Sequence, residues 1–393
     1  MVCKVFVTLQ TILYNIYNNT TLKTNRLISI CVLIVLGLSS LQAQVITEPI
    51  FNQFKLEARA DLEFQSVDKE FSGSVTEHPR GFNGRYFNLL VGGNLTPEVS
   101  YCFRQRIIAK EGTVSLFDNT DFLYINYQPT EHWMFRLGKD AIAVGGFEND
   151  APPIDVLFST VYWDNFYCFQ LGGAAAYRSA DGSNTLMLQV ANSPYVYYNA
   201  FGAQELGKEW QRGLMAYSLF YSGTVGHLHM LYSANLFERP DHGYMNYLAI
   251  GNKLVYDRWD IYLDLIHRAH GYSDWGNNFA VVSCLNFQLT PSLNLFAKGA
   301  YEQNRSDKSV DGMDIVRGRF DCLVPTGESF TTYGLGFELR PQFCRDLRIH
   351  GFIASRHHTA ISQPSDNSLY INGGITWDMD IHAIVTQRMK QNQ

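Results

Sequence analysis

Apolar and charged side chains alternate along residues 54–64, which read FKLEARADLEF. In a strand, Phe54, Leu56 and Ala58 would share one face with their counterparts further on, and the charged residues would share the other. The same period of two recurs over residues 87–91, 186–190, 228–232, 259–265, 279–287, 333–339 and 369–377. Most runs extend over about nine to thirteen residues, whereas strands of soluble domains average about 5–6 and a strand tilted across a bilayer needs about 9–11. The pattern therefore predicts an all-β protein, a transmembrane antiparallel barrel with one face toward lipid and the other toward water.

The connections between these runs alternate between short and long. Short connections occupy residues 95–100, 128–133, 222–226, 256–260, 289–293 and 340–346. Long connections occupy residues 65–84, 110–120, 140–165, 194–210, 303–328 and 357–367. Short turns at one end and long loops at the other are typical of outer-membrane barrels.

Counting the runs predicts sixteen strands within residues 44–380, and a tail on the periplasmic side over residues 381–393. Eighteen strands are the alternative, if the tail pairs as a further strand and an early strand escapes the pattern. A barrel of sixteen strands is too wide for side chains to fill, so we expect an aqueous channel along its axis.

Composition narrows the class of protein. Aromatic residues make up 14% and charged residues 17% of the 393-residue chain, and the mean hydropathy is -0.13. These values suit a membrane barrel or a secreted β-sandwich or propeller, and the length of the runs favours the barrel. The net charge of -6 argues against a nucleic-acid partner. Aromatic side chains at run ends fit the girdles at the two membrane interfaces, namely Tyr86, Trp133, Trp259, Tyr301 and Trp377.

The N-terminal segment has the features of a secretory signal peptide. Lys23 and Arg26 precede the apolar run LISICVLIVLGL at residues 27–38, and the small residue Ala43 follows. A positive flank, a short apolar core and a small residue at the end are the three parts of such a signal. We therefore expect residues 1–43 to be a signal peptide.

Residues 135–160, FRLGKDAIAVGGFENDAPPIDVLFST, resemble a segment of the phosphate-selective porin O and P family. The matching positions are Arg136, Gly138, Lys139, Gly146, Phe147 and Glu148. The strand pattern over most of residues 50–380 is similar to that of divergent members from Bacteroidota. The resemblance implies a sixteen-stranded porin whose third long loop, residues 140–165 here, folds inward as a constriction.

Alternation also assigns charged side chains to the lumen. The residues we expect to line the pore or its constriction are Arg104, Arg106, Arg136, Lys139, Glu148, Asp150, Asp155 and Lys298. Inward-facing bases modestly outnumber inward-facing acids, and the three loop acids offset part of this excess. We expect Arg104, Arg106 and Arg136 to give a weak anion preference, and the loop acids to pair with them and hold the loop against the wall.

The predicted function is passive diffusion of small hydrophilic solutes across an outer membrane. A more specific form of this prediction adds a mild preference for phosphate-like anions. A barrel that binds partners through its long loops and an outer-membrane hydrolase are the alternatives. The chain has no GxSxG, GxGxxG, HExxH or P-loop motif in a fitting context, so we predict no enzyme, no catalytic or metal-binding residue and no cofactor. Expected partners are small hydrophilic solutes or anions, the lipid bilayer and lipopolysaccharide of a Gram-negative bacterium, and further copies of the chain in a homotrimer.

Overall fold

The computed structural model describes residues 52–69, 75–77, 80–107, 117, 119–166, 168–194, 213–238, 243–269, 276–305, 324, 327–360 and 365–391. The signal peptide expected at residues 1–43 and parts of several expected long loops lie outside the described residues.

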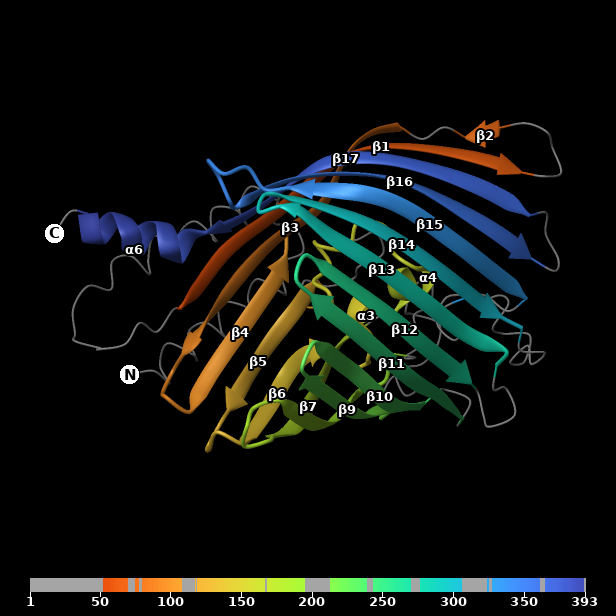
Figure 1. Ribbon diagram of the computed structural model, residues 1–393. Helices are drawn as coiled ribbons and strands as arrows, with labels where there is room; N and C mark the ends of the chain where they lie inside the picture. Colours follow the sequence, from red (N-terminus) through yellow and green to blue (C-terminus); the bar gives the residue numbers. More distant parts are fainter. Residues whose placement is uncertain are drawn as a thin grey trace, which may run out of the picture. The chain divides into compact units, whose positions relative to one another are not determined.

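The described residues form one antiparallel sheet whose strands follow one another in chain order (Figure 1). The first strands are β1 (Gln53–Lys69), the short β2 (Val75–Glu77), β3 (Arg80–Asn94), β4 (Val99–Arg106), β5 (Thr120–Tyr127) and β6 (Trp133–Ala141). After the helical turns α3 (Phe147–Asp150) and α4 (Val161–Asn165) come β7 (Phe169–Arg178), β8 (Asn184–Asn192), β9 (Met215–Val225), β10 (Leu228–Glu238) and β11 (Tyr244–Tyr256). The chain ends with β12 (Trp259–Ala269), β13 (Asn278–Thr290), β14 (Leu293–Asn304), β15 (Glu328–Leu339), β16 (Leu347–Ala360), β17 (Asp366–Asp380) and helix α6 (Ile381–Gln391).

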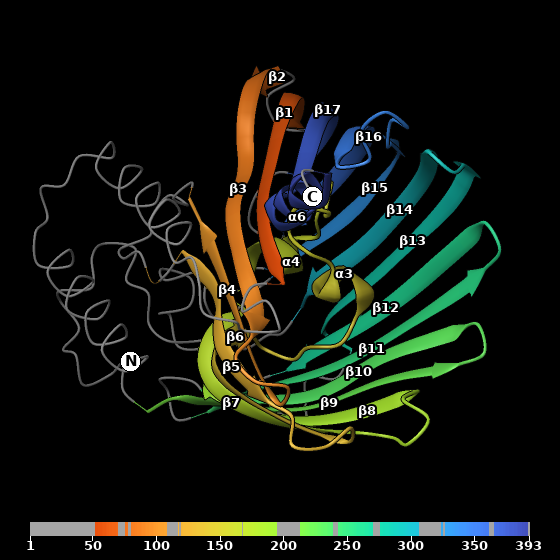
Figure 2. The ribbon, with the colours of Figure 1, turned by 90° about the vertical axis from the view of Figure 1, so that its left-hand side faces the viewer.

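The sheet closes into a barrel because β1 pairs on both sides. One edge of β1 pairs with β3, and the other pairs with β17 in a register that runs from Lys55 opposite Asp380 to Lys69 opposite Asp366 (Figure 2). β2 has three residues and pairs with the outer end of β1, so in the described part of the chain sixteen long strands make the ring. The prediction of sixteen strands is confirmed. The alternative of eighteen is wrong, since residues 381–391 form α6 and not a further strand.

The two faces of the barrel differ as the alternation predicts. Large apolar side chains point outward and stay exposed, among them Leu137, Leu188, Leu263 and Leu335. Trp133, Trp259 and Trp377 are exposed near the short-turn end, where an aromatic girdle is expected. Tyr86 does not belong to a girdle, because it pairs opposite Arg59 and shares the inner face with that residue.

Two β-bulges place additional charged residues inside the barrel. In β3 the register against β1 shifts between Arg59 and Ala60, and Arg85 is the extra residue. In β5 the register against β4 shifts between Arg104 and Gln105, and Asp121 is the extra residue. A bulge redirects a side chain out of strict alternation. The side chains of Arg85 and Asp121 therefore contact charged residues of the inner face, as described below.

No helix among the described residues is long and apolar enough to cross a membrane.

The face assignment can be tested at two neighbouring residues near the middle of β8. Leu188 points outward and is 61% exposed, whereas Met187 lies on the inner face opposite Ala176 and Phe220. Leu188→Arg should impair folding into bilayers, because an arginine on the lipid face at the membrane midplane costs about 2–4 kcal/mol. Met187→Arg should fold almost as well as the parent chain, since its guanidinium reaches water in the lumen. The measurement is the urea dependence of folding into phospholipid vesicles, and equal midpoints for the two variants would contradict the assignment.

Candidate functional site: the inward loop and the pocket beside it

The segment from residue 142 to residue 168, which we call the inward loop, connects β6 to β7 and lies within the ring of strands (Figure 2). Its apolar side chains pack against the inner face of the opposite wall. Ile142, Val144, Tyr162 and Phe166 form one buried cluster with Ala216, Phe237, Met245, Tyr247, Ala249, Ile266 and Ala280 of β9 to β13. The prediction of an inward-folded third loop is confirmed, with bounds a few residues beyond the expected 140–165.

Glycine allows the start of the loop to approach the wall closely. Gly146 has φ of 101°, a conformation that side-chain-bearing residues rarely adopt. Its backbone N–H donates to the carbonyl of Leu231 at 3.3 Å, and a Cβ at this position would lie 3.2 Å from Cγ of Asp264. A larger residue here would move the loop away from β12. This is a physical reason for a glycine at one of the positions that match the family motif.

Two carboxylates of the wall bind the first turns of α3 and α4. Asp264 on β12 accepts hydrogen bonds from the backbone N–H groups of Phe147 and Glu148, both at 2.9 Å. Glu302 on β14 accepts from the N–H groups of Val161 at 2.9 Å and Tyr162 at 2.7 Å. The first N–H groups of a helix have no partner within the helix, and negative charge is favourable beside them. Each carboxylate therefore satisfies two buried donors and fixes one turn of the loop.

A lysine on the same wall adds a third anchor. The ammonium of Lys298 on β14 pairs with the carboxylate of Glu148 and donates to the carbonyl of Phe158. Glu148 in turn accepts from the hydroxyl of Thr160 at 2.8 Å and from its N–H at 3.1 Å. The charges of Lys298 and Glu148 are thus neutralised within a buried cluster that ties the two ends of the loop together.

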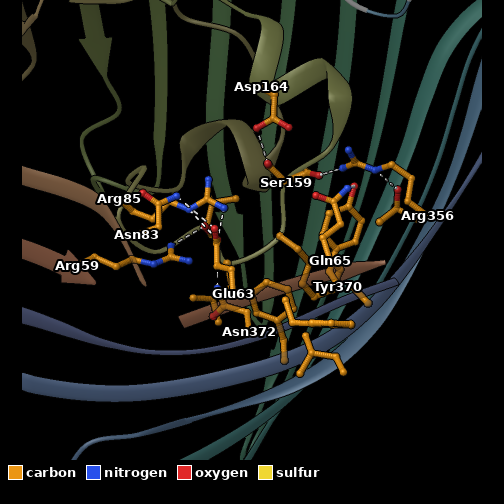
Figure 3. A pocket seen from close by; sticks show the side chains of 18 of the residues that line it. Arg59, Glu63, Gln65, Asn83, Arg85, Ser159, Asp164, Arg356, Tyr370 and Asn372 are labelled. Atoms are coloured by element: carbon orange, nitrogen blue, oxygen red, sulfur yellow. Dashed lines mark hydrogen bonds and ion pairs between the residues drawn. The ribbon is translucent and has the colours of Figure 1, made fainter. Parts of the chain in front are cut away.

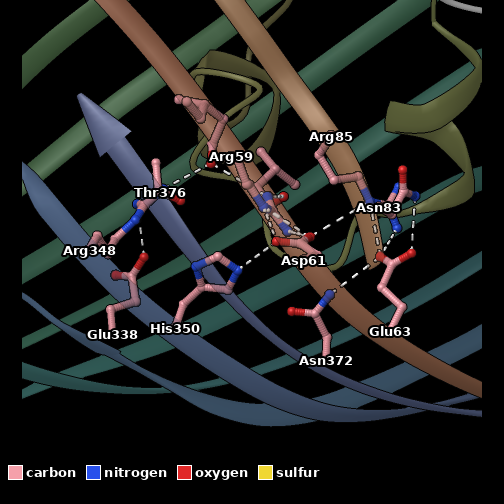
Figure 4. A network of polar contacts seen from close by, with 12 residues as sticks. Arg59, Asp61, Glu63, Asn83, Arg85, Glu338, Arg348, His350, Asn372 and Thr376 are labelled. Atoms are coloured by element: carbon pink, nitrogen blue, oxygen red, sulfur yellow. Dashed lines mark hydrogen bonds and ion pairs between the residues drawn. The ribbon is translucent and has the colours of Figure 1, made fainter. Parts of the chain in front are cut away.

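Two arginines hold the tip of the loop (Figure 4). Nη1 of Arg59 on β1 donates to the carbonyl of Val156 at 2.9 Å, and Nη2 of Arg348 on β16 donates to that of Ile154 at 2.9 Å. Arg348 also pairs with Asp155 at 2.7 Å and with Glu338 of β15 at 2.9 Å. The loop is therefore bound to strands on both sides of the β1–β17 closure.

The charge of Arg59 is balanced by a buried network. Its guanidinium pairs with Asp61 at 2.8 Å, and both side chains are almost fully buried. Asp61 also accepts from Nε2 of His350 at 3.0 Å and lies 3.7 Å from Nε of Arg85. Buried charges are tolerated only when paired and hydrogen-bonded. Asp61 thus serves as the common acceptor that keeps Arg59 directed at the loop tip.

The three arginines expected to give anion preference do face the lumen, but they pair within the wall. Arg104 and Arg106 of β4 both contact Asp121, the bulge residue of β5, at 3.0 and 2.9 Å. Arg136 of β6 pairs with Asp140 and donates to Oδ1 of Asn126 at 2.8 Å. The loop acids pair elsewhere, Glu148 with Lys298 and Asp155 with Arg348. The expectation that the loop acids bind these three arginines is therefore wrong.

Two residues expected to line the pore or its constriction remain, Lys139 and Asp150, and they lie in different places. Lys139 pairs in register with Leu123 and Leu171, which are exposed outer-face residues, and its ammonium donates to the carbonyl of Phe117 at 2.6 Å. It therefore shares the outer face, and its assignment to the pore lining is corrected. Asp150 lies on the inward loop at the end of α3, and no ion pair of its carboxylate is found within the described residues.

A pocket of about 420 Å³ lies between the inward loop and the wall formed by β1, β3 and β15 to β17 (Figure 3). The wall contributes Arg59, Glu63, Gln65, Asn83, Arg85, Tyr86, Arg356, Tyr370 and Asn372, and the loop contributes residues 156–159, Trp163 and Asp164. Nη2 of Arg356 donates to the carbonyl of Ser159 at 2.7 Å, so the pocket and the loop anchor share a residue.

The alternation over residues 54–64 placed Arg59 and Glu63 on the charged face but gave them no role, because the sequence holds no information on where the loop would dock. Sequence reasoning missed Arg85 and Asp121 because bulges break the alternation on which it relied. Within the described ranges, no cluster of three histidine, cysteine or acidic side chains is arranged to hold a metal ion.

The anchoring role of Asp264 predicts a change in channel noise. Asp264→Asn replaces an acceptor-only group by an amide whose NH2 would face an N–H donor, and an unsatisfied buried donor costs about 1–3 kcal/mol. The loop should then loosen, and open-channel current noise in planar bilayers should rise. Asp260→Asn is the matched control, since Asp260 lies on the same face of β12 but contacts Lys253 and Asn286 of the wall. Equal noise in the two variants would contradict the role of Asp264.

Comparisons with known proteins agree with this architecture. The phosphate-selective porin O and P profile matches residues 54–271, more than half of the chain. No curated protein sequence matches the chain. Among solved structures, Pseudomonas putida OprB is similar with a TM-score of 0.57 and 8% identity, over 83% of this chain and 94% of that one. The outer membrane channel DcaP of Acinetobacter baumannii has a TM-score of 0.54 and 11% identity, over 83% and 96%. OmpT, an outer membrane protein of Vibrio cholerae, has a TM-score of 0.52 and 10% identity, over 86% and 100%.

At these identities the solved structures support the fold alone. The profile match adds the family, and together with the closed barrel and its inward loop it leads to one conclusion: the chain belongs to the phosphate-selective porin O and P family and is an outer-membrane porin.

Proposed function

We propose that this porin allows small hydrophilic solutes to diffuse passively through a lumen that is narrowed by the inward loop. The observation that carries the proposal is the anchoring of that loop by buried contacts from β1, β12, β14 and β16. A loop fixed inside a wide barrel reduces the cross-section of the lumen. It does not close the lumen as a folded domain would. The fixed loop therefore supports a permanently open, size-limited channel and not a carrier.

The charge arrangement supports weak selectivity. Arg104 and Arg106 share the carboxylate of Asp121, and Arg136 is paired with Asp140. Paired charges produce a weak field beyond about one Debye length, about 8 Å at physiological salt. Two guanidinium groups against one carboxylate leave a local positive excess beside β4. We propose that any anion preference, including one for phosphate-like anions, is mild and originates at this excess.

The proposal places the barrel in the outer membrane of a Gram-negative bacterium, surrounded by lipid and lipopolysaccharide. The long loops would then face outward and the short turns and α6 would face the periplasm, in agreement with the usual orientation of such barrels. A homotrimer is the proposed assembly.

Single-channel recording tests the proposed function directly. The purified protein in planar bilayers should give stable conductance steps in KCl without any added ligand. Liposomes that contain it should swell in isotonic solutions of small solutes, and swelling should slow steeply as solute size increases. Absence of both conductance and swelling in correctly folded protein would overturn the proposal.

The origin of selectivity can be tested by charge removal and compensation. Replacing Arg104, Arg106 and Arg136 by Gln leaves Asp121 and Asp140 without their cations, so the anion-to-cation permeability ratio should fall by roughly twofold or more. Adding Asp121→Asn and Asp140→Asn should return the ratio toward that of the parent chain. The ratio is obtained from the reversal potential in a KCl gradient. An unchanged potential in the triple variant would remove these residues from the selectivity filter.

A further inference from the structure

We propose that the pocket between the inward loop and β1, β3 and β15 to β17 binds an organic anion that carries one carboxylate on an aromatic body. The inference rests on the proposed diffusion function and names a solute class for the same channel. It concerns saturable binding of one solute, whereas the weak selectivity among small ions is ascribed to the arginines of β4 and β6. The charge of the lining, the contacts of one arginine and the arrangement of the aromatic rings support it.

The lining of the pocket carries an excess of positive charge (Figure 3). It contains four arginines and two carboxylates, namely Arg59, Arg80, Arg85, Arg356, Glu63 and Asp164. Behind the lining, the buried carboxylate of Asp61 pairs with Arg59. Four positive charges against three negative ones, Asp61 included, leave one positive charge. The pocket therefore favours an anion over a neutral or cationic solute.

The fixed cation of the pocket is Arg356. Its Nη2 donates to the carbonyl of Ser159 at 2.7 Å, and its Nε donates to the hydroxyl of Thr332 at 3.2 Å. Both acceptors are neutral, and within the described residues Arg356 forms no ion pair, so its position is fixed while its charge is not cancelled. A guanidinium has five N–H donors, and these two contacts leave others for a carboxylate. Arg80 also lacks an ion pair in the described ranges, but it lies exposed at the outer end of β3, where water and salt screen it.

The two acids of the lining do not prevent an anion from binding. Glu63 pairs with Arg85 and also accepts from Nδ2 of Asn372 at 3.3 Å. Asp164 is exposed, so water screens its charge, and its carboxylate accepts from the hydroxyl of Ser159. These acids do favour a single negative charge over a phosphate, which carries about two and would be repelled more strongly.

Aromatic rings surround a small residue next to Arg356. Ala354 is buried on the same face of β16, and Tyr370 of β17 pairs opposite it. Cζ of Arg356 lies 5.8 Å from the centroid of the Tyr370 ring. On the other side of Ala354 along β16, Phe352 packs against Phe158 of the inward loop with ring centroids 5.2 Å apart. All five residues line the pocket, which therefore has a guanidinium at one end of an aromatic-walled space.

This space matches a flat apolar solute with one charged end. Alternate residues on one face of a strand lie about 7 Å apart, so a carboxylate at Arg356 places an attached ring over Ala354. There the ring can pack on Tyr370, and Trp163 of the loop adds a further aromatic surface to the lining. The volume of about 420 Å³ falls within the roughly 300–1,000 Å³ typical of small-molecule sites. An inorganic anion would leave these rings in contact with water, and a neutral aromatic solute would leave Arg356 without a counter-charge.

Block of KCl conductance by four solutes tests the inference. Benzoate, titrated at constant ionic strength, should reduce the single-channel current saturably. Benzamide keeps the ring without the charge and acetate keeps the charge without the ring, so each should need an about tenfold higher concentration for half-maximal block. Inorganic phosphate should also block only at higher concentrations than benzoate. Absence of benzoate block, or half-maximal block by any of the other three solutes at or below the benzoate concentration, would overturn the proposed solute class.

Three variants locate the benzoate block in the pocket. Arg356→Gln keeps an amide donor for the loop carbonyl but removes the charge, and should raise the half-maximal concentration about tenfold. Tyr370→Leu should raise it about three- to tenfold through lost ring packing. Among the described residues Tyr370→Leu removes no hydrogen bond to the inward loop, since the hydroxyl accepts from Gln65 of β1. Lys55→Gln is the matched control, because Lys55 pairs with Asp378 at 3.5 Å and does not line the pocket, so block should be unchanged.

The same recordings separate the two proposals. Equal block in all three variants would place benzoate elsewhere, and equal loss in Arg356→Gln and Lys55→Gln would trace it to the general field of the lumen. Either result overturns the pocket as the site. Normal KCl conductance without benzoate block overturns the solute class alone and leaves the diffusion function intact, whereas absence of any KCl conductance overturns both.

Discussion

Every backbone N–H and C=O group in the membrane-spanning part of this chain must find a partner within the protein, because hydrocarbon offers none. The pairing of β1 with both β3 and β17 meets that constraint, since it leaves no strand edge facing lipid. Closure at sixteen long strands then creates a lumen too wide for wall side chains to fill. The channel is thus a consequence of how the sheet satisfies its hydrogen bonds, and the inward loop determines how much of that channel stays open.

The same constraint applies again inside the lumen, where the inward loop has buried backbone groups and little regular structure of its own. The wall supplies the missing partners: Asp264 and Glu302 accept from N–H groups, and Arg59, Arg348 and Lys298 donate to carbonyls. The acceptors on β12 and β14 lie where the helical turns begin, and the donors on β1, β14 and β16 lie beside carbonyls of the loop. The buried charges of the wall therefore have a structural use before any solute enters.

This use limits the selectivity that the charges can provide. A guanidinium that pairs with a carboxylate and holds a loop carbonyl has few donors left for a passing anion. The family to which the chain belongs is named for phosphate selectivity, but in this chain Arg59, Arg85 and Arg348 are paired with Asp61, Glu63 and Glu338. Arg356 donates to the carbonyl of Ser159. The pocket that remains between them is rich in amides and aromatic rings.

The sequence by itself determined the barrel, its sixteen strands and the lipid and lumen faces, because alternation with a period of two and strand length act locally and repeat along the chain. It also placed Arg104, Arg106, Arg136 and Lys298 in the lumen. The inward third loop was implied by the family resemblance of residues 135–160 and not by the alternation. Only the tertiary structure decided which charges meet. Two bulges turn Arg85 and Asp121 inward against the alternation, a shared outer-face register moves Lys139 out of the lumen, and the docking of the loop selects Lys298 and Arg348 as partners of Glu148 and Asp155. These pairings join residues far apart in the chain, so they depend on barrel closure and loop packing, which no local pattern encodes.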